Sequence, residues 1–251
     1  MSDAPKRTTI LLRSLALQLF LNYKTMQGPG YLMSLRSELS DHDPEKTRAA
    51  GSFINGHPVF SSIALGALAK RLRGSVDAAA AADISEWKRT LSTPLGSIGD
   101  SLIWERFKPA LLALAAGILL LGSNIAEGLW GWLVLLMMLT YNLALWNFRN
   151  WGFERGFELG ETVSELALHP ALPKVRKFLR VLGIVAASLV IAGTIKSSLG
   201  PSPTTWMQFC AGFLLMLGAS KLRLNTLTVA FFAILFSFGI YFLNTQTHLL
   251  P

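Results

Sequence analysis

The chain has a single cysteine and few charged residues for its length. Among 251 residues, Cys210 is the one cysteine, and 15% of residues are charged, against about 25% in soluble domains. One cysteine excludes an intramolecular disulfide and a zinc site built from cysteines. With an apolar share of 51%, this composition argues against a disordered chain and against an ordinary soluble enzyme. We therefore expect a membrane protein.

The short motifs of common catalytic and nucleotide-binding sites are also missing. The sequence holds no GxxxxGK[ST] phosphate loop, no GxGxxG, no HExxH and no GxSxG. Cys210 lies among Phe, Ala and Gly, an apolar setting that does not activate a thiol. A secretory leader is not recognisable, because the first apolar stretch, 9–21, is interrupted by Arg13 and Gln18. We expect no catalytic residue, no metal and no cofactor.

Acidic residues are absent from the last part of the chain, and polarity falls towards the C-terminus. Lys plus Arg and Asp plus Glu number 14 and 10 in residues 1–108, six and five in 109–180, and three and none in 181–251. We predict a cytoplasm-facing, partly re-entrant N-terminal region, 1–108, and a transmembrane helical region, 109–251. Five apolar segments predict the membrane-spanning helices of an all-α polytopic protein: 109–122, 129–148, 181–199, 206–218 and 226–243.

The charges of the connecting loops orient these segments. The loop 149–180 holds six Lys and Arg, whereas the loop 123–128 holds none. Because basic loops stay on the cytoplasmic side, five crossings place the N-terminus in the cytoplasm and the C-terminus outside. The count of five depends on two segments, 109–122 and 206–218, that are short for a span.

The N-terminal region contains broken apolar segments. Leu12, Leu15, Leu19 and Tyr23 recur at helical spacing, which predicts an amphipathic helix ended by the Gly-Pro-Gly at 28–30. Such a helix lies in the membrane interface, packs on a partner, or packs on the same subunit. The segment 53–60, FINGHPVF, predicts a non-helical break because the residue before a proline favours an extended backbone.

Asp100 follows Gly96 and Gly99 in an otherwise uncharged stretch, 91–104. A stretch this short is typical of a re-entrant or buried segment, and an ionised Asp at membrane depth indicates a functional site. The alternative is that Asp100 is the N-cap of a helix that begins at Ser101.

Three segments resemble motifs of subunit IID of the mannose-family sugar phosphotransferase systems. In chain order, the first segment is 13–30, the second is FINGHP, 53–58, and the third is TPLGSIGDSLIW, 93–104. Pro109, the region 152–156 and LNTLTV, 224–229, follow in matching order. The first segment, 13–30, carries Arg13, Ser14, Gln18, Asn22, Tyr23, Met26, Gln27, Gly28 and Gly30.

The resemblance implies a multi-pass subunit of the bacterial inner membrane that forms the path of a hexose-type sugar with a second subunit, IIC. It implies related, inverted architectures with broken helices, a trimer of IIC–IID heterodimers, and cytoplasmic IIA and IIB subunits that carry the phosphoryl group. IID itself carries none. We expect the sugar path to be faced by five polar residues: Asn22, Gln27, Asn55, His57 and Asp100.

The chain also departs from the family pattern. Lys70, Arg71 and Arg73 stand where the family has an acidic run, and Glu105 and Lys108 replace a Gly and an Arg. These departures support a second hypothesis, in which the chain is a regulatory or assembly partner in the membrane without efficient sugar transport.

Overall fold

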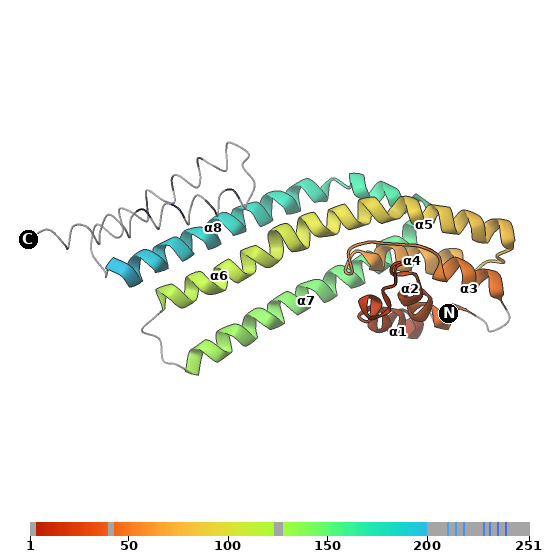
Figure 1. Cartoon of the computed structure of the whole chain (residues 1–251), viewed down its shortest axis with the longest axis horizontal. Coiled ribbons are helices and arrows are strands. Elements are labelled where there is room, and N and C mark those ends of the chain that lie inside the picture. Colours follow the sequence, from red (N-terminus) through yellow and green to blue (C-terminus); the bar gives the residue numbers. More distant parts are fainter. Residues whose placement is uncertain are drawn as a thin grey trace, which may run out of the picture. The chain divides into compact units, whose positions relative to one another are not determined.

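The computed structural model describes residues 4–39, 43–122 and 128–199, together with seven isolated positions between 210 and 239. In these residues the chain is helical and forms no β-strand, which confirms the all-α class (Figure 1). Two isolated β-bridges pair Asn22 with Met26 and Met26 with Ile54.

The described helices fall into a series of short N-terminal elements followed by longer ones. Elements η1, η2 and η4 are 3-10 helices and η3 is a π-helix. In chain order they are α1 (Ala4–Ser14), η1 (Leu17–Phe20), α2 (Gly28–Ser34), η2 (Arg36–Glu38), α3 (Pro44–Gly51), α4 (Ser61–Arg71), α5 (Ala78–Gly99), η3 (Asp100–Phe107), α6 (Lys108–Leu121), α7 (Gly128–Leu159), η4 (Gly160–Leu168) and α8 (Ala171–Leu199).

Three of the predicted spans coincide with described helices. The segment 109–122 is α6, 129–148 lies within α7, and 181–199 lies within α8. The segments 206–218 and 226–243 lie outside the described residues, apart from isolated positions. By length and composition, one helical stretch of the described chain is able to cross a membrane, Trp130–Leu166. The number of spans therefore stays a prediction.

The predicted amphipathic helix from Leu12 to the Gly-Pro-Gly at 28–30 is wrong. Helix α1 ends at Ser14, a turn and η1 follow, and α2 begins only at Gly28. The predicted apolar face is exposed: Leu12, Leu15, Leu19 and Tyr23. The core instead contains Ile10, Leu11 and Leu17, each 1% exposed. Ile10 and Leu11 are buried within α1 and Leu17 within η1, after the turn that ends α1.

The chain forms two compact units. Unit 1 comprises 1–101 and 142–172, and unit 2 comprises 102–141 and 173–251. In unit 2, α6 and α8 pack closely through glycines. An added Cβ at Gly117 would overlap Leu189, and one at Gly193 would overlap Leu120. Small residues that allow close backbone approach are typical of helix pairs in membranes.

The core of unit 1 is built around α4, in which residues 61–69 are all buried. Helix α4 packs against η4 and crosses the C-terminal part of α7 at very short range. An added Cβ at Gly66 would overlap the carbonyl oxygen of Phe153, and one at Gly156 would overlap that of Ile63. At this crossing the two backbones leave no space for a side chain.

We expect Gly156→Ala to lower the free energy of unfolding by about 1–3 kcal/mol, because the new methyl group overpacks the α4–α7 crossing. Gly131→Ala in the same helix is the matched control. No atom lies within 4 Å of a Cβ added there, so the better helix propensity of Ala should stabilise by up to about 1 kcal/mol. Thermal unfolding of both variants in detergent measures the difference; equal stability would contradict the close crossing.

Candidate functional site

Gln27, in the first motif segment, holds the loop of the second motif segment by hydrogen bonds. Its backbone N–H donates to the Ile54 carbonyl at 2.9 Å. Its side-chain Nε2 donates to the Gly56 carbonyl at 2.7 Å, while its Oε1 accepts from the Gly56 N–H at 3.2 Å and from Ser61 Oγ at 3.1 Å. The Gln27 side chain is buried, and both its amide nitrogen and its amide oxygen bond to the loop or to Ser61, which holds the loop 53–58 in place.

The third motif segment, in α5, lies against the same loop. The Asn55 N–H donates to Ser92 Oγ at 3.1 Å. An added Cβ at Gly96 would lie 3.9 Å from the Gly56 Cα, and one at Gly99 would overlap the His57 side chain. Glycine at position 99 therefore permits the loop to lie directly on α5. The three segments that resemble the family motifs come together in unit 1.

His57 is a buried, neutral side chain of this junction. It is 2% exposed, its Nδ1 accepts from the Val59 N–H at 3.2 Å, and its ring meets Phe60 edge-on at 6.0 Å between centroids. Burial, and secondarily the charge of Arg149, lowers the pKa of His57 from 6.5 to about 4. The imidazole is therefore uncharged at neutral pH and serves the packing of the loop on α5.

This pKa shift predicts a loss of stability in acid. Because the unfolded chain binds a proton at His57 below pH 6.5 and the folded chain does not until about pH 4, lowering the pH across this window favours unfolding. Through this group the free energy of unfolding should fall by about 3 kcal/mol. His57→Asn keeps an acceptor near Nδ1 and removes the titration. Unfolding temperatures measured across this pH window should fall less steeply in the variant; identical slopes would contradict a neutral His57.

Arg149 was missed as part of this region, because the sequence places it at the start of a basic loop. The structure instead puts it inside α7, where it is 8% exposed. Its guanidinium donates to the Pro58 carbonyl at 3.0 Å and to Ser14 Oγ at 3.3 Å. Arg149 thereby ties the second motif segment to the end of α1.

Lys88 was also missed. It is fully buried, and its Nζ donates to the carbonyls of Ala49, Ala50 and Ser52 at 3.1, 2.7 and 2.8 Å. These carbonyls end α3, so the ammonium caps a helix C-terminus, and it also lies 5.3 Å from the Tyr31 ring centroid. Burial opposes the charge and lowers the pKa of Lys88 to about 7. A signal was present in the sequence: residues 84, 88, 91 and 95 share one helix face, and the other three are apolar.

The side chains of Asn22 and Asn55 are exposed. The Asn22 Oδ1 accepts from the backbone N–H groups of Lys24 and Thr25 at 2.9 and 2.8 Å, which fixes the turn 22–26. This turn reaches the second segment through the bridge between Met26 and Ile54. By contrast, no other described residue donates a hydrogen bond to the Asn55 side chain, which is open for a ligand.

Asp100 is not the N-cap of a helix that begins at Ser101, so that alternative is wrong. Its backbone is helical, with φ −59° and ψ −47°, and its N–H donates to the carbonyls of Gly96 and Ser97. Helical residues therefore run through Asp100, which opens the π-helix η3, and π-helical turns are frequent at functional sites. Thr93 and Ser97 precede it on the same face and are exposed, and no described residue donates to its carboxylate.

Comparison with known proteins gives a consistent result. Residues 3–249 match the profile of the family described as "PTS system mannose/fructose/sorbose family IID component". The chain is 25% identical over 191 residues to the mannose-specific EIID component of Escherichia coli K12, covering 72% of this chain and 65% of that protein. It is 28% identical over 173 residues to the sorbose-specific EIID component of Lacticaseibacillus casei, covering 63% and 58%. The chain thus spans less than two thirds of the length of these relatives.

Two solved structures resemble the fold. One is a cryo-EM structure of the mannose transporter ManYZ in complex with microcin E492, at a TM-score of 0.53 and 20% identity. The other, described as a membrane protein, has a TM-score of 0.59 and 19% identity. Both likenesses cover 93% of this chain and 94% of the matched chain, and they show the fold.

Proposed function

Because the chain belongs to the IID component family of the mannose/fructose/sorbose phosphotransferase systems, we propose that it is the IID membrane subunit of a sugar permease. One observation carries this proposal. Gln27 of the first motif segment bonds Gly56 of the second, and Gly96 and Gly99 of the third lie directly against that same loop, although the three segments are far apart in the sequence. This junction also leaves the polar side chains of Asn55 and Asp100 accessible.

The junction divides the five polar residues by role. Asn55 and Asp100 have side chains open to a ligand, and amide and carboxylate groups recognise sugar hydroxyls by hydrogen bonds. Gln27 and His57 are buried and position the loop that carries Asn55. Asn22 fixes the neighbouring turn. In this proposal Asn55 and Asp100 contact the sugar, and the other three residues position the segments around the path.

We propose that this subunit works within a larger assembly, as the family membership favours. The chain pairs with a IIC subunit to form the path of a hexose-type sugar, and IIC–IID heterodimers form a trimer. Cytoplasmic IIA and IIB subunits carry out the phosphoryl transfer, so this chain is not itself an enzyme. It crosses the inner membrane of a bacterial cell with its N-terminus in the cytoplasm and its C-terminus outside, as the loop charges favour.

The alternative of a non-transporting partner is less well supported, because the unusual cations have partners inside unit 1. Lys70 Nζ donates to the Glu158 carbonyl at 2.8 Å, at the C-terminal end of α7. Arg71 pairs with Asp83 and Glu161 at 2.6 and 3.1 Å. These residues stabilise helix ends and connections within the chain, and their presence gives no reason to abandon transport.

Pairing with IIC is tested by expression with and without that subunit. Short apolar segments leave backbone groups facing lipid unless a partner covers them, so the chain alone should be degraded or aggregated. Co-expression with the IIC subunit of the same system should yield a complex that copurifies through a tag on either protein. A chain that is monodisperse and stable on its own in detergent, and fails to copurify, would contradict the pairing.

A further inference from the structure

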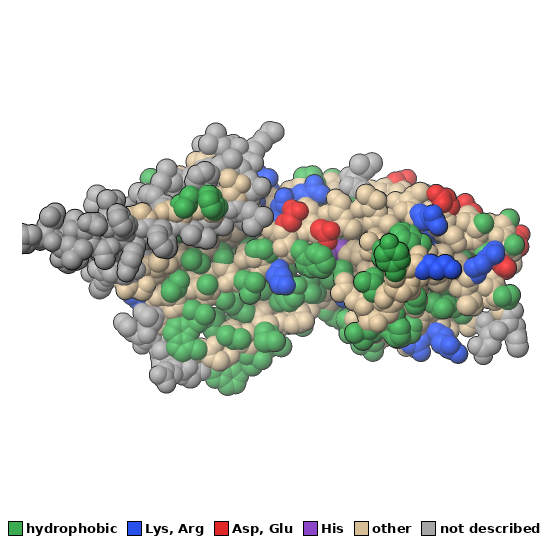
Figure 2. Space-filling model, in the orientation of Figure 1, with side chains coloured by type: hydrophobic (Ala, Val, Ile, Leu, Met, Phe, Trp, Pro, Cys, Tyr) green, Lys and Arg blue, Asp and Glu red, His purple; other side chains and the backbone are tan. Residues whose placement is uncertain are grey.

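Unit 1 exposes a cluster of apolar side chains near its N-terminus. It consists of six residues between α1 and the turn 22–26, which we call the N-terminal apolar patch: Leu12, Leu15, Leu19, Phe20, Leu21 and Tyr23. All six are at least 41% exposed, with Leu19 at 83% and Tyr23 at 97%. Figure 2 shows hydrophobic side chains gathered over the α1 part of unit 1. An exposed apolar cluster of this kind marks an interaction surface.

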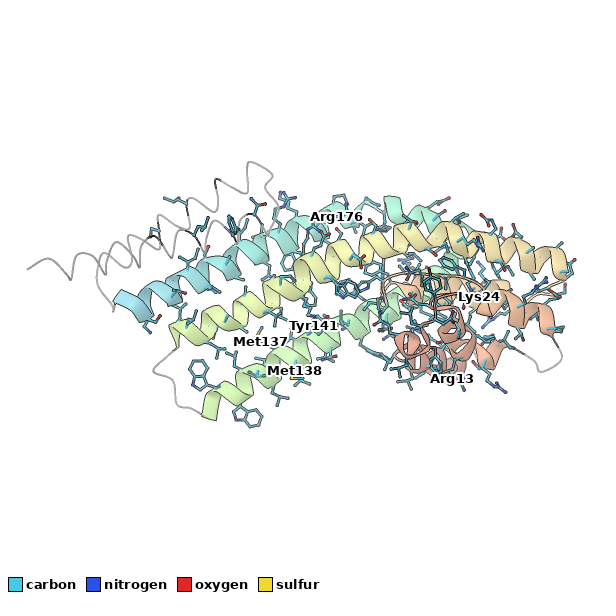
Figure 3. The ribbon with its side chains drawn as sticks, viewed as in Figure 1. Arg13, Lys24, Met137, Met138, Tyr141 and Arg176 are labelled. Carbon is cyan, nitrogen blue, oxygen red and sulfur yellow. The ribbon has the colours of Figure 1, made fainter. Side chains whose placement is uncertain are left out.

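The charges around the patch are of one sign. Between residues 4 and 37 the chain carries five Lys and Arg and no Asp or Glu. Two of these cations, Arg13 in α1 and Lys24 in the turn that follows, flank the patch and form no ion pair with any described residue (Figure 3). Lys24 is exposed, whereas Arg13 is half-buried, with its Nη1 buried and without a hydrogen-bond partner in the described chain. A protein partner that covered the patch would have to supply acids to both, whereas an anionic lipid layer supplies phosphates everywhere.

The turn 22–26 gives the patch a fixed tip. The backbone groups of Asn22 and Met26 exchange hydrogen bonds of 3.1 and 3.0 Å, and the Asn22 side chain holds the turn from within. Tyr23 and Lys24 therefore stand side by side at the tip of a rigid turn. A Tyr ring beside a Lys is the pair that membrane interfaces favour, with the ring among the headgroups and the ammonium at the phosphates.

From these observations we propose that the N-terminal apolar patch, with Arg13 and Lys24, anchors unit 1 to the headgroup layer of an anionic lipid bilayer. The apolar side chains enter the boundary between headgroups and acyl chains, and the two cations bind lipid phosphates. The anchor does not depend on sugar transport, and it would also operate in a family member that transports nothing.

The test places a fluorescent label at Leu19. The full chain, with Cys210→Ser and Leu19→Cys, is labelled with an environment-sensitive dye and reconstituted with its membrane partner into nanodiscs. Lipids with a nitroxide at a shallow acyl position should quench the dye, and aqueous iodide should not. Ala82→Cys, at an exposed position of α5, is the control and should show the reverse.

The lipid charge is tested in the same nanodiscs with brominated lipids. Brominated phosphatidylglycerol should quench the Leu19 label at lower mole fraction than brominated phosphatidylcholine. Lys24→Gln and Arg13→Gln should each reduce this preference by about five-fold, the effect of one basic residue near an anionic surface. Lys174→Gln, which is exposed in α8, should leave it unchanged.

Two outcomes would overturn the proposal. Quenching of the Leu19 label by iodide in nanodiscs would show that the patch faces water. A label on the assembled complex that neither iodide nor the lipid-borne nitroxide quenches would show that a protein covers the patch. Failure to copurify with the partner is a separate result, which bears on the pairing and leaves the lipid measurement on this chain intact.

Discussion

Replacement of Lys88 by methionine should lower the free energy of unfolding by about 3 kcal/mol, although it removes a buried charge. Methionine fills a similar volume but donates no hydrogen bond. The carbonyls of Ala50 and Ser52, which accept from Lys88 at 2.7 and 2.8 Å, would then end α3 without this donor. Buried groups left without a partner cost more than the net gain of the bond that satisfied them. Thermal or denaturant unfolding in detergent at pH 6, where the ammonium is present, measures the loss.

Lys70→Met is the matched control. Lys70 also donates to a carbonyl at the end of a helix, but its side chain is exposed, so water replaces the lost donor. We expect a loss below about 1 kcal/mol there. If Lys88→Met were as stable as the natural chain, the cost of burying the charge would balance its three hydrogen bonds, and Lys88 would not hold α3 in place.

Asp100→Asn should weaken the apparent affinity of sugar uptake roughly 10- to 150-fold, because hydrogen bonds to a charged group contribute about 1.5–3 kcal/mol. The substitution keeps the size of the side chain and leaves the helical backbone of η3 undisturbed. The maximal uptake rate depends on assembly of the complex and should not change, whereas the apparent affinity depends on the contact with the sugar and should fall.

Asp77→Asn provides the control for Asp100→Asn. Asp77 is the N-cap of α5, where its side chain accepts from the Ala80 N–H at 2.8 Å. Asn caps a helix as well as Asp does, so the fold and the uptake affinity should not change. Natural affinity in an Asp100→Asn protein that assembles normally would exclude a contact between this carboxylate and the sugar.

The sequence predicts the elements better than it predicts their breaks. The long apolar run of α7 follows from composition alone, because length and hydropathy select it. The segment 12–32 does not, because its helical spacing marks residues that the fold leaves exposed. Periodicity identifies a face, but here that face is the N-terminal apolar patch, and the core is made by Leu11 and Leu17.

For the candidate site, too, the sequence predicts some features and misses others. Gln27, Asn55 and Asp100 are recognisable because polar residues stand in apolar, glycine-rich or proline-broken segments. Their roles cannot be predicted from the sequence. Only the folded chain shows that the amide of Gln27 bonds to Gly56, whereas the side chain of Asn55 remains accessible. Lys88 and Arg149 are missed because their partners are backbone carbonyls, which leave no pattern in the sequence.

The central claim is tested most directly by sugar uptake. Cells that lack their own mannose-type permease receive the IIA, IIB and IIC subunits of the same system, with or without this chain, and are given a panel of labelled hexoses. We predict that at least one hexose accumulates as its phosphate only when the chain is present. Equal accumulation without the chain, or no uptake of any hexose by an assembled complex, would contradict the assignment of the chain as a transport subunit.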